Sequence, residues 1–313
     1  MIVAEHISKH YGARLALDDV SFRIAKGEVI GFLGLNGAGK TTMLKVLSGL
    51  LLPSRGRVIV DGVDGARDAR GLRRRIGFLP DRPPLYLDFT VRQMLRYAGG
   101  LHGLEGRFLE QRVDEVLALA GLTHVQDDLI EWLSHGYRQR VGIAQTIVHA
   151  PALVILDEPI SGLDPEQIVS MRALIRGLAE HHTVLLSSHI LGEISQTCDR
   201  LLVLQAGRLV AEGTEEQLMH GVTPQGLELT VRGTEENARG ALGAVGSISA
   251  VELVAKEGEF VRLRLDAASP RAAEEAVAAL VAAGLGVRRV VERGGGLEAV
   301  FLSLTRGASK EAA

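Results

Sequence analysis

A glycine-rich stretch over residues 34–42 constrains the fold of this chain more than any other feature. It reads Gly-Leu-Asn-Gly-Ala-Gly-Lys-Thr-Thr and fits the pattern G-x-x-x-x-G-K-[ST], known as Walker A. A short apolar run over residues 29–33 precedes it, and a helical pattern over residues 41–50 follows it. A strand that leads through such a loop into a helix is the context of a P-loop, in which backbone N–H groups and the helix N-terminus surround phosphate. The sequence therefore predicts an α/β domain with a phosphate site at the end of a buried strand.

Two side chains of this loop carry specific chemistry. Lys40 can reach the β- and γ-phosphates of a nucleotide, and the Thr41 hydroxyl can ligate Mg²⁺. A glycine-rich turn without any phosphate role is the alternative, and the flanking strand and helix disfavour it. The predicted nucleotide-binding residues of the loop are Gly34, Leu35, Asn36, Gly37, Ala38, Gly39, Lys40, Thr41 and Thr42.

A pair of carboxylates follows a second apolar run, which covers residues 153–156. Asp157 and Glu158 stand at its carboxyl end, and an open α/β sheet binds its ligands at this end of its strands. Asp157 is predicted to hold Mg²⁺ together with Thr41, either directly or through water. Glu158 is predicted to act as the general base that polarises the attacking water.

Composition excludes several classes of protein. The 313 residues carry 35 Lys and Arg against 38 Asp and Glu, a net charge of −3, so no global positive charge favours binding to nucleic acid or anionic lipid. Cys198 is the single cysteine, which rules out an intrachain disulfide and fits a reducing cytosol. There is no signal-peptide pattern and no run of about 18 apolar residues, so another chain is expected to supply any path through a membrane.

The chain is predicted to contain two domains. Residues 1–219 alternate strand-like and helix-like segments, with an early antiparallel piece at residues 2–6 and 21–24. A Gly- and Pro-containing linker follows, and residues 227–306 show the order β-α-β-β-α-β of a small split-βαβ, α+β domain. This accessory domain includes one apolar helical stripe after residue 296, and residues 307–313 are predicted to be a disordered tail.

Further motifs occur in an order that resembles the ATP-binding subunits of ABC transporters. The resemblance covers residues 1 to about 219 and rests on the P-loop, on Leu-Ser-His-Gly-Tyr at residues 133–137, on Asp157 and Glu158, and on Ser-Gly-Leu-Asp at residues 161–164. It implies that Tyr11 stacks on adenine and that His189 is the switch histidine that senses the γ-phosphate. An ordinary surface aromatic and a structural histidine are the alternatives at these two positions.

Two departures from the family pattern narrow the resemblance. The signature usually reads Leu-Ser-Gly-Gly-Gln, whereas this chain has His135 and Tyr137 and keeps Ser134 and Gly136, which are expected to contact the γ-phosphate bound to a partner subunit. Asp81 stands where the family usually has the glutamine of the Q-loop, and it is expected to approach the nucleotide and Mg²⁺. These features resemble the ABC-2-type export branch, and in particular subunits associated with gliding motility.

The resemblance implies a function. It predicts an ATPase with ATP and Mg²⁺ as cofactors, working as a head-to-tail homodimer with two ATP molecules at the interface. The expected partner is an ABC-2-type transmembrane permease at the cytoplasmic face of the cell membrane, with membrane contact only through that permease and with no nucleic acid. One alternative is a soluble ABC ATPase with a non-transport client, which the single P-loop disfavours. The other is a regulatory nucleotide-binding module without turnover, which Glu158 disfavours.

Overall fold

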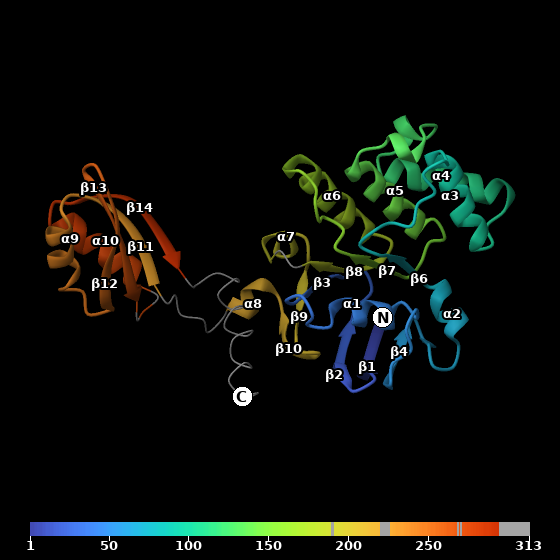
Figure 1. Ribbon diagram of the computed structural model, residues 1–313, viewed down its shortest axis with the longest axis horizontal. Coiled ribbons are helices and arrows are strands. Elements are labelled where there is room, and N and C mark those ends of the chain that lie inside the picture. Colours follow the sequence, from blue (N-terminus) through green and yellow to red (C-terminus); the bar gives the residue numbers. More distant parts are fainter. Residues whose placement is uncertain (189–190, 220–225, 268, 270, 294–313) are drawn as a thin grey trace. The chain divides into compact units, whose positions relative to one another are not determined.

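The computed structural model describes residues 1–188, 191–219, 226–267, 269 and 271–293 (Figure 1). The glycine-rich loop follows β3 (Val29–Leu33), a strand with a parallel neighbour on each side. The chain divides into two units, Met1–Thr214 and Glu215–Ala313. The first unit contains a six-stranded sheet in the order β10-β9-β3-β8-β7-β6, in which only β10 runs antiparallel to its neighbour. Its strands are β3 (Val29–Leu33), β6 (Ile76–Leu79), β7 (Leu153–Asp157), β8 (Thr183–Ser188), β9 (Arg200–Gln205) and β10 (Arg208–Gly213).

A second, antiparallel sheet of the first unit has the order β2-β1-β4-β5. Its strands are β1 (Ile2–Tyr11), β2 (Arg14–Ile24), β4 (Arg55–Val60) and β5 (Val63–Asp64). The early antiparallel piece predicted from the sequence is therefore confirmed, with longer strands than expected. The two-residue turn between β1 and β2 contains Gly12, whose positive φ of 57° suits a tight hairpin connection.

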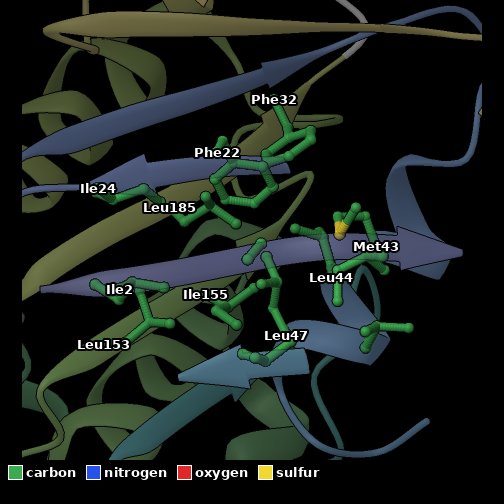
Figure 2. Close-up of a cluster of buried hydrophobic side chains, with 14 of the residues drawn as sticks. Ile2, Phe22, Ile24, Phe32, Met43, Leu44, Leu47, Leu153, Ile155 and Leu185 are labelled. Carbon is green, nitrogen blue, oxygen red and sulfur yellow. The ribbon is translucent and has the colours of Figure 1, made fainter. Parts of the chain in front are cut away.

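A hydrophobic core of the first unit lies between these two sheets and includes the apolar face of helix α1 (Lys40–Leu47). Side chains from β1 and β2 meet side chains from β3, β7 and β8, and the apolar face of α1 fills the space between them (Figure 2). Phe22 and Phe32 make an edge-to-face contact across it, with ring centroids 5.5 Å apart. The helix predicted over residues 41–50 ends at Leu47, because Gly49 takes a left-handed φ of 69° and turns the chain away.

Several helices accompany the six-stranded sheet. They are α2 (Ala69–Arg74), α3 (Val91–Leu101), α4 (Gly106–Leu119), α5 (His135–Ile147), α6 (Pro165–Leu178) and α7 (Leu191–Ser195). Two short 3₁₀ turns, Thr123–Val125 and Ile130–Trp132, lead into α5. Helix α3 begins with a capping box between Thr90 and Gln93, and Arg92 joins it to α4 through Asp114 at 2.6 Å. Helix α5 packs against both α3 and the edge of the sheet.

The second unit has its own sheet and core. It consists of α8 (Glu215–Met219), β11 (Gly226–Arg232), α9 (Glu235–Leu242), β12 (Ile248–Glu257), β13 (Phe260–Ala267), α10 (Ala272–Ala282) and β14 (Gly286–Arg293). The strand order is β12-β13-β11-β14 and every pairing is antiparallel, which is the arrangement of a split-βαβ fold. Leu227, Leu229, Leu263 and Leu265 form part of its core. The predicted helical stripe and tail after residue 296 lie outside the described residues.

None of the helices in the described part of the chain combines the length and the apolar character needed to cross a membrane.

The packing of α1 predicts a large loss of stability when its core face is truncated. Leu44 is fully buried among both sheets, so Leu44→Ala should lower the free energy of unfolding by about 2–5 kcal/mol. Leu50, three residues beyond the helix, is 62% exposed, and Leu50→Ala should change stability by less than about 0.5 kcal/mol. Urea unfolding of both variants checks this, and equal losses in the two would contradict the assigned core.

Candidate functional site

The strand register brings the predicted motifs together at one edge of the six-stranded sheet. Strand β8 lies between β3 and β7, with Leu33 opposite Ser188 on one side and Asp157 opposite Ser187 on the other. Because parallel strands end at the same edge, the loop after β3 and the carboxylates after β7 face a common space. That space is a cavity of about 510 Å³. It is lined by Tyr11, Arg14, Ala16, Leu35, Asn36, Gly37, Gly39, Lys40, Thr41, Thr42, Asp81, Asp157, Glu158 and Ser161.

The glycine-rich loop takes a shape that requires glycine at Gly39. This residue caps the N-terminus of α1 with a φ of 109°, and a Cβ there would lie 2.8 Å from the carbonyl oxygen of Ala16. The N-terminus of α1 therefore faces the cavity with its free N–H groups, which is the arrangement that favours an anion. Gly34 and Ala38, two of the predicted phosphate residues, do not line the cavity, and Ala38 is buried.

The Lys40 side chain is held inside the loop. Its ammonium donates hydrogen bonds to the carbonyl oxygens of Gly34, at 2.6 Å, and Leu35, at 3.4 Å, and the residue is buried. Burial lowers the pKa of Lys40, while the charges of Glu158 and Asp157 act in the opposite direction. The charge of Lys40 thus interacts with both carboxylates and offsets part of their repulsion toward a phosphate ligand.

Asp157 and Glu158 are oriented by Ser187, a residue that the sequence analysis did not assign. The Ser187 hydroxyl donates to Asp157 Oδ1 at 2.6 Å, and it accepts from the backbone N–H of Glu158 at 3.0 Å. Glu158 has a φ of 52°, a strained value for a residue with a side chain, and such strain concentrates at functional sites. The apolar strand over residues 184–187 is visible in the sequence, but its pairing with β7 is tertiary.

Burial and neighbouring carboxylates act together on Asp157. Burial raises the pKa of Asp157 most, and the charges of Glu158 and Asp81 raise it further. Hydrogen bonds from Ser187 and Thr41 lower it, so the two effects oppose each other. Three carboxylates close enough to repel one another favour the entry of a cation alongside a phosphate ligand.

Tyr11 and Arg14 form one wall of the cavity. They pair across the β1–β2 hairpin, and Tyr11 is 48% exposed, with the Lys9 ammonium 5.5 Å from the centroid of its ring. An exposed aromatic ring at the mouth of such a cavity offers a face for stacking on a base. Sequence reasoning missed Arg14, although the Gly12 turn that places it beside Tyr11 is a readable hairpin signal.

The signature residues do not line the cavity of their own chain. Ser134 caps α5 by accepting from the backbone N–H of Tyr137, and a Cβ on Gly136 would come within 2.2 Å of the Gln167 side chain. His135 Nε2 donates to the carbonyl oxygen of Ser161 at 3.3 Å, and the Tyr137 hydroxyl lies 3.1 Å from a ring nitrogen of His124. His189 lies outside the described residues, so its predicted role remains a prediction.

Comparison with known proteins agrees with these features. The ABC transporter family profile matches residues 17–161. The chain is similar to the bacitracin transport ATP-binding protein BcrA of Bacillus licheniformis, with 37% identity covering 68% of this chain and 69% of the relative. It is also 37% identical to the daunorubicin resistance ATP-binding protein DrrA3 of Streptomyces coeruleorubidus, over 97% of this chain and 95% of the relative.

A solved structure resembles the fold. It is the dimeric ATP-binding cassette MJ0796 in a post-hydrolysis state bound to ADP and Pi, with 25% identity and a TM-score of 0.62. The match covers 68% of this chain and 98% of the cassette. The phosphate loop, the paired carboxylates and these similarities together identify the chain as an ATPase that belongs to the family of ABC transporter ATP-binding proteins.

Proposed function

We propose that this chain is the ATP-hydrolysing subunit of an ABC-2-type exporter and that it works as a head-to-tail dimer with two ATP molecules at its interface. The observation that carries the proposal is the cavity in which Lys40, Thr41, Asp157 and Glu158 converge beside Tyr11. The relatives BcrA and DrrA3 support the export assignment, because their names refer to bacitracin transport and daunorubicin resistance. The dimeric cassette with ADP and Pi supports the dimer.

The donor atoms around the cavity fit Mg²⁺. The Thr41 hydroxyl and the Asp157 carboxylate are oxygen ligands, and they already lie close enough to share a hydrogen bond. No group of three His, Cys, Asp or Glu among the described residues could hold a metal unaided. This suits Mg²⁺, which proteins bind through one or two side chains together with phosphate oxygens. When bound, the ion would neutralise phosphate charge, and Thr41 and Asp157 are the residues that would hold it.

Each residue of the site has a role in this proposal. Tyr11 stacks on adenine, and the loop from Gly34 to Thr42 holds the phosphates with Lys40. Glu158 accepts the proton of the attacking water, and Ser187 fixes the backbone that carries it. Ser134 and Gly136 reach the γ-phosphate in the partner subunit, in line with their absence from the cavity of their own chain. His189 senses the γ-phosphate, and the permease holds the chain at the cytoplasmic face of the membrane.

The role of Glu158 predicts that catalysis can be separated from binding. Glu158→Gln keeps the size and the strained backbone position but removes the basic carboxylate, so ATP hydrolysis should fall by about 10²–10⁴-fold while ATP still binds. The trapped nucleotide should hold the dimer closed, which gel filtration with ATP and Mg²⁺ would detect as a shift from monomer to dimer. Glu180→Gln, an exposed matched change, should have neither effect. Near-normal turnover in Glu158→Gln would eliminate the assigned role.

The position of Asp81 predicts an effect on nucleotide affinity. Asp81 lines the cavity and its charge raises the pKa of Asp157, so Asp81→Gln removes repulsion from the phosphate site. Mg-ATP should bind several-fold more tightly, an effect of about 1 kcal/mol, and basal hydrolysis should stay within a factor of a few. Stimulation by the permease should be lost. Asp88→Asn, an exposed change in the same segment, serves as the control for titration calorimetry.

Two results for Asp81→Gln would contradict this account. Unchanged stimulation by the permease would remove the coupling role of the residue. Weaker binding of Mg-ATP would indicate that the carboxylate contacts the metal favourably instead of repelling the phosphates.

We propose that the first domain alone binds and hydrolyses ATP and that the second domain is an accessory to it. The ATP-binding domain covers residues 1–219, and the accessory domain covers residues 227–306. The sequence of the accessory domain contains no phosphate loop, and this domain has a core of its own. A chain truncated after residue 219 should therefore fold and bind ATP within about threefold of the full chain. Circular dichroism checks folding and calorimetry checks affinity. A large loss of ATP affinity in a folded truncation would show that the accessory domain contributes to the site.

A further inference from the structure

Trp132 is the most exposed of the large apolar side chains in the described part of the chain. It is 72% accessible, and it is the single tryptophan of the sequence. An aromatic side chain buries about 150–250 Å² when it is covered, so this exposure leaves a large apolar contact unused in the isolated chain. Tryptophan is also enriched among the residues that contribute most to binding at protein interfaces.

The turn that carries Trp132 is held by hydrogen bonds on two sides. The N–H groups of Ile130 and Glu131 donate to carbonyl oxygens of the segment 87–89, each at 3.0 Å. The Arg138 guanidinium, from the start of α5, donates to the carbonyl oxygens of Ile130 at 3.1 Å and Glu131 at 2.7 Å. The backbone at Trp132 is therefore already ordered, and a partner that covers this residue fixes little more than one side chain.

Trp132 and Ser134 lie on the same side of the chain. Leu133, between them, has an extended backbone with a φ of −76° and a ψ of 145°, and its side chain is buried. Successive side chains of an extended segment alternate, so those of Trp132 and Ser134, both exposed, point away from the core together. Two extended residues span about 7 Å, so a surface that Ser134 contacts lies within reach of Trp132.

The nucleotide cavity has an exposed apolar rim. Tyr11 and Leu35 both line the cavity and are 48% and 52% accessible, whereas Trp132 does not line the cavity of its own chain. In the proposed head-to-tail dimer, Ser134 and Gly136 enter the cavity of the partner subunit. Trp132 then meets the surface around that cavity, where an apolar side chain and an apolar rim are complementary.

Charge distinguishes a second copy of this chain from other partners. Three exposed acidic residues lie within five positions of Trp132, namely Asp127, Asp128 and Glu131. Anionic lipid and nucleic acid attract basic segments, so acidic neighbours disfavour both. The rim of the nucleotide cavity instead carries the Arg14 guanidinium beside Tyr11. A second copy of the chain therefore matches both the apolar and the acidic character of this segment.

We propose that Trp132 closes the nucleotide cavity of the partner subunit by packing on the apolar rim formed by the partner's Tyr11 and the partner's Leu35. Ser134 then contacts the phosphates while Trp132 covers the mouth of the cavity beside them, and nucleotide leaves only after Trp132 leaves the rim. Trp132 is a positioning residue that sets the lifetime of the closed dimer and touches no reacting atom. This proposal rests on the proposed function, because it requires the head-to-tail dimer.

The fluorescence of the single tryptophan reports on this contact directly. In Glu158→Gln with ATP and Mg²⁺, the emission of Trp132 should move to shorter wavelength, and its quenching by acrylamide should fall about threefold as the ring is covered. Gel filtration of the same sample establishes whether a dimer is present. A dimer in which Trp132 stays as accessible as in the monomer would overturn the proposal. Failure to form any dimer would instead contradict the proposed function.

Substitution measures what the contact contributes. In the Glu158→Gln background, Trp132→Ala should raise the dissociation constant of the ATP-bound dimer at least about tenfold, because a symmetric dimer contains the contact twice. Trp132→Phe should recover most of the loss, since an aromatic contact remains. Phe108→Ala removes another exposed aromatic, 58% accessible on α4, and should leave dimerisation unchanged. Equal losses in the Trp132→Ala and Phe108→Ala variants would refute a specific contact.

A double-substitution cycle tests where Trp132 packs. Leu35→Ala should weaken the dimer by itself at saturating ATP but should add little to Trp132→Ala, because both changes remove one interaction. With Glu158 intact, single-turnover hydrolysis by preformed dimers of Trp132→Ala should stay within about twofold of wild type, whereas release of ADP should be faster. Additive losses of dimer affinity would place Trp132 against a different surface and would refute the assigned rim.

Discussion

The register of β3, β8 and β7 is the constraint on which the site depends. In this register Asp157 stands opposite Ser187, and Leu33 stands opposite Ser188. One serine hydroxyl can then hold both the Asp157 carboxylate and the Glu158 backbone. A shift of a single residue would turn these side chains to the other face of the sheet, so the buried apolar faces that set the register also set the catalytic geometry. The core between the two sheets therefore stabilises the site as well as the fold (Figure 2).

Unbalanced charge marks the nucleotide cavity of the first unit. In the nucleotide cavity, the carboxylates of Asp157, Glu158 and Asp81 repel one another, and Lys40 is the buried cation opposite Asp157 and Glu158. Strain and unfavourable charge of this kind concentrate at functional sites. Asp81 comes two residues after the edge strand β6, so this strand leads into the cavity.

The departures in the signature segment are accommodated within one chain. His135 donates to the carbonyl oxygen of Ser161, which belongs to the segment that follows Glu158 and lines the nucleotide cavity. A Cβ on Gly136 would meet the end of the Gln167 side chain, which would have to move aside. The start of α5 is thus held against the segment that leads from the carboxylates into α6. The family pattern alone does not suggest this contact, since a glycine at position 135 has no side chain that could make it.

Local sequence determined the chemistry of this protein, and tertiary structure decided its geometry. The glycine-rich loop, Asp157 and Glu158 could be identified because glycine conformation, helix start signals and apolar runs are encoded within a few residues. Most of the loop, both carboxylates, Tyr11 and Asp81 do line one cavity, and the β-α-β-β-α-β order of the second unit could be read in the same way. The role of Ser187 could not be predicted in this way. Asp157 and Glu158, which it contacts, are far away in the chain, and only the strand register brings the serine hydroxyl to them.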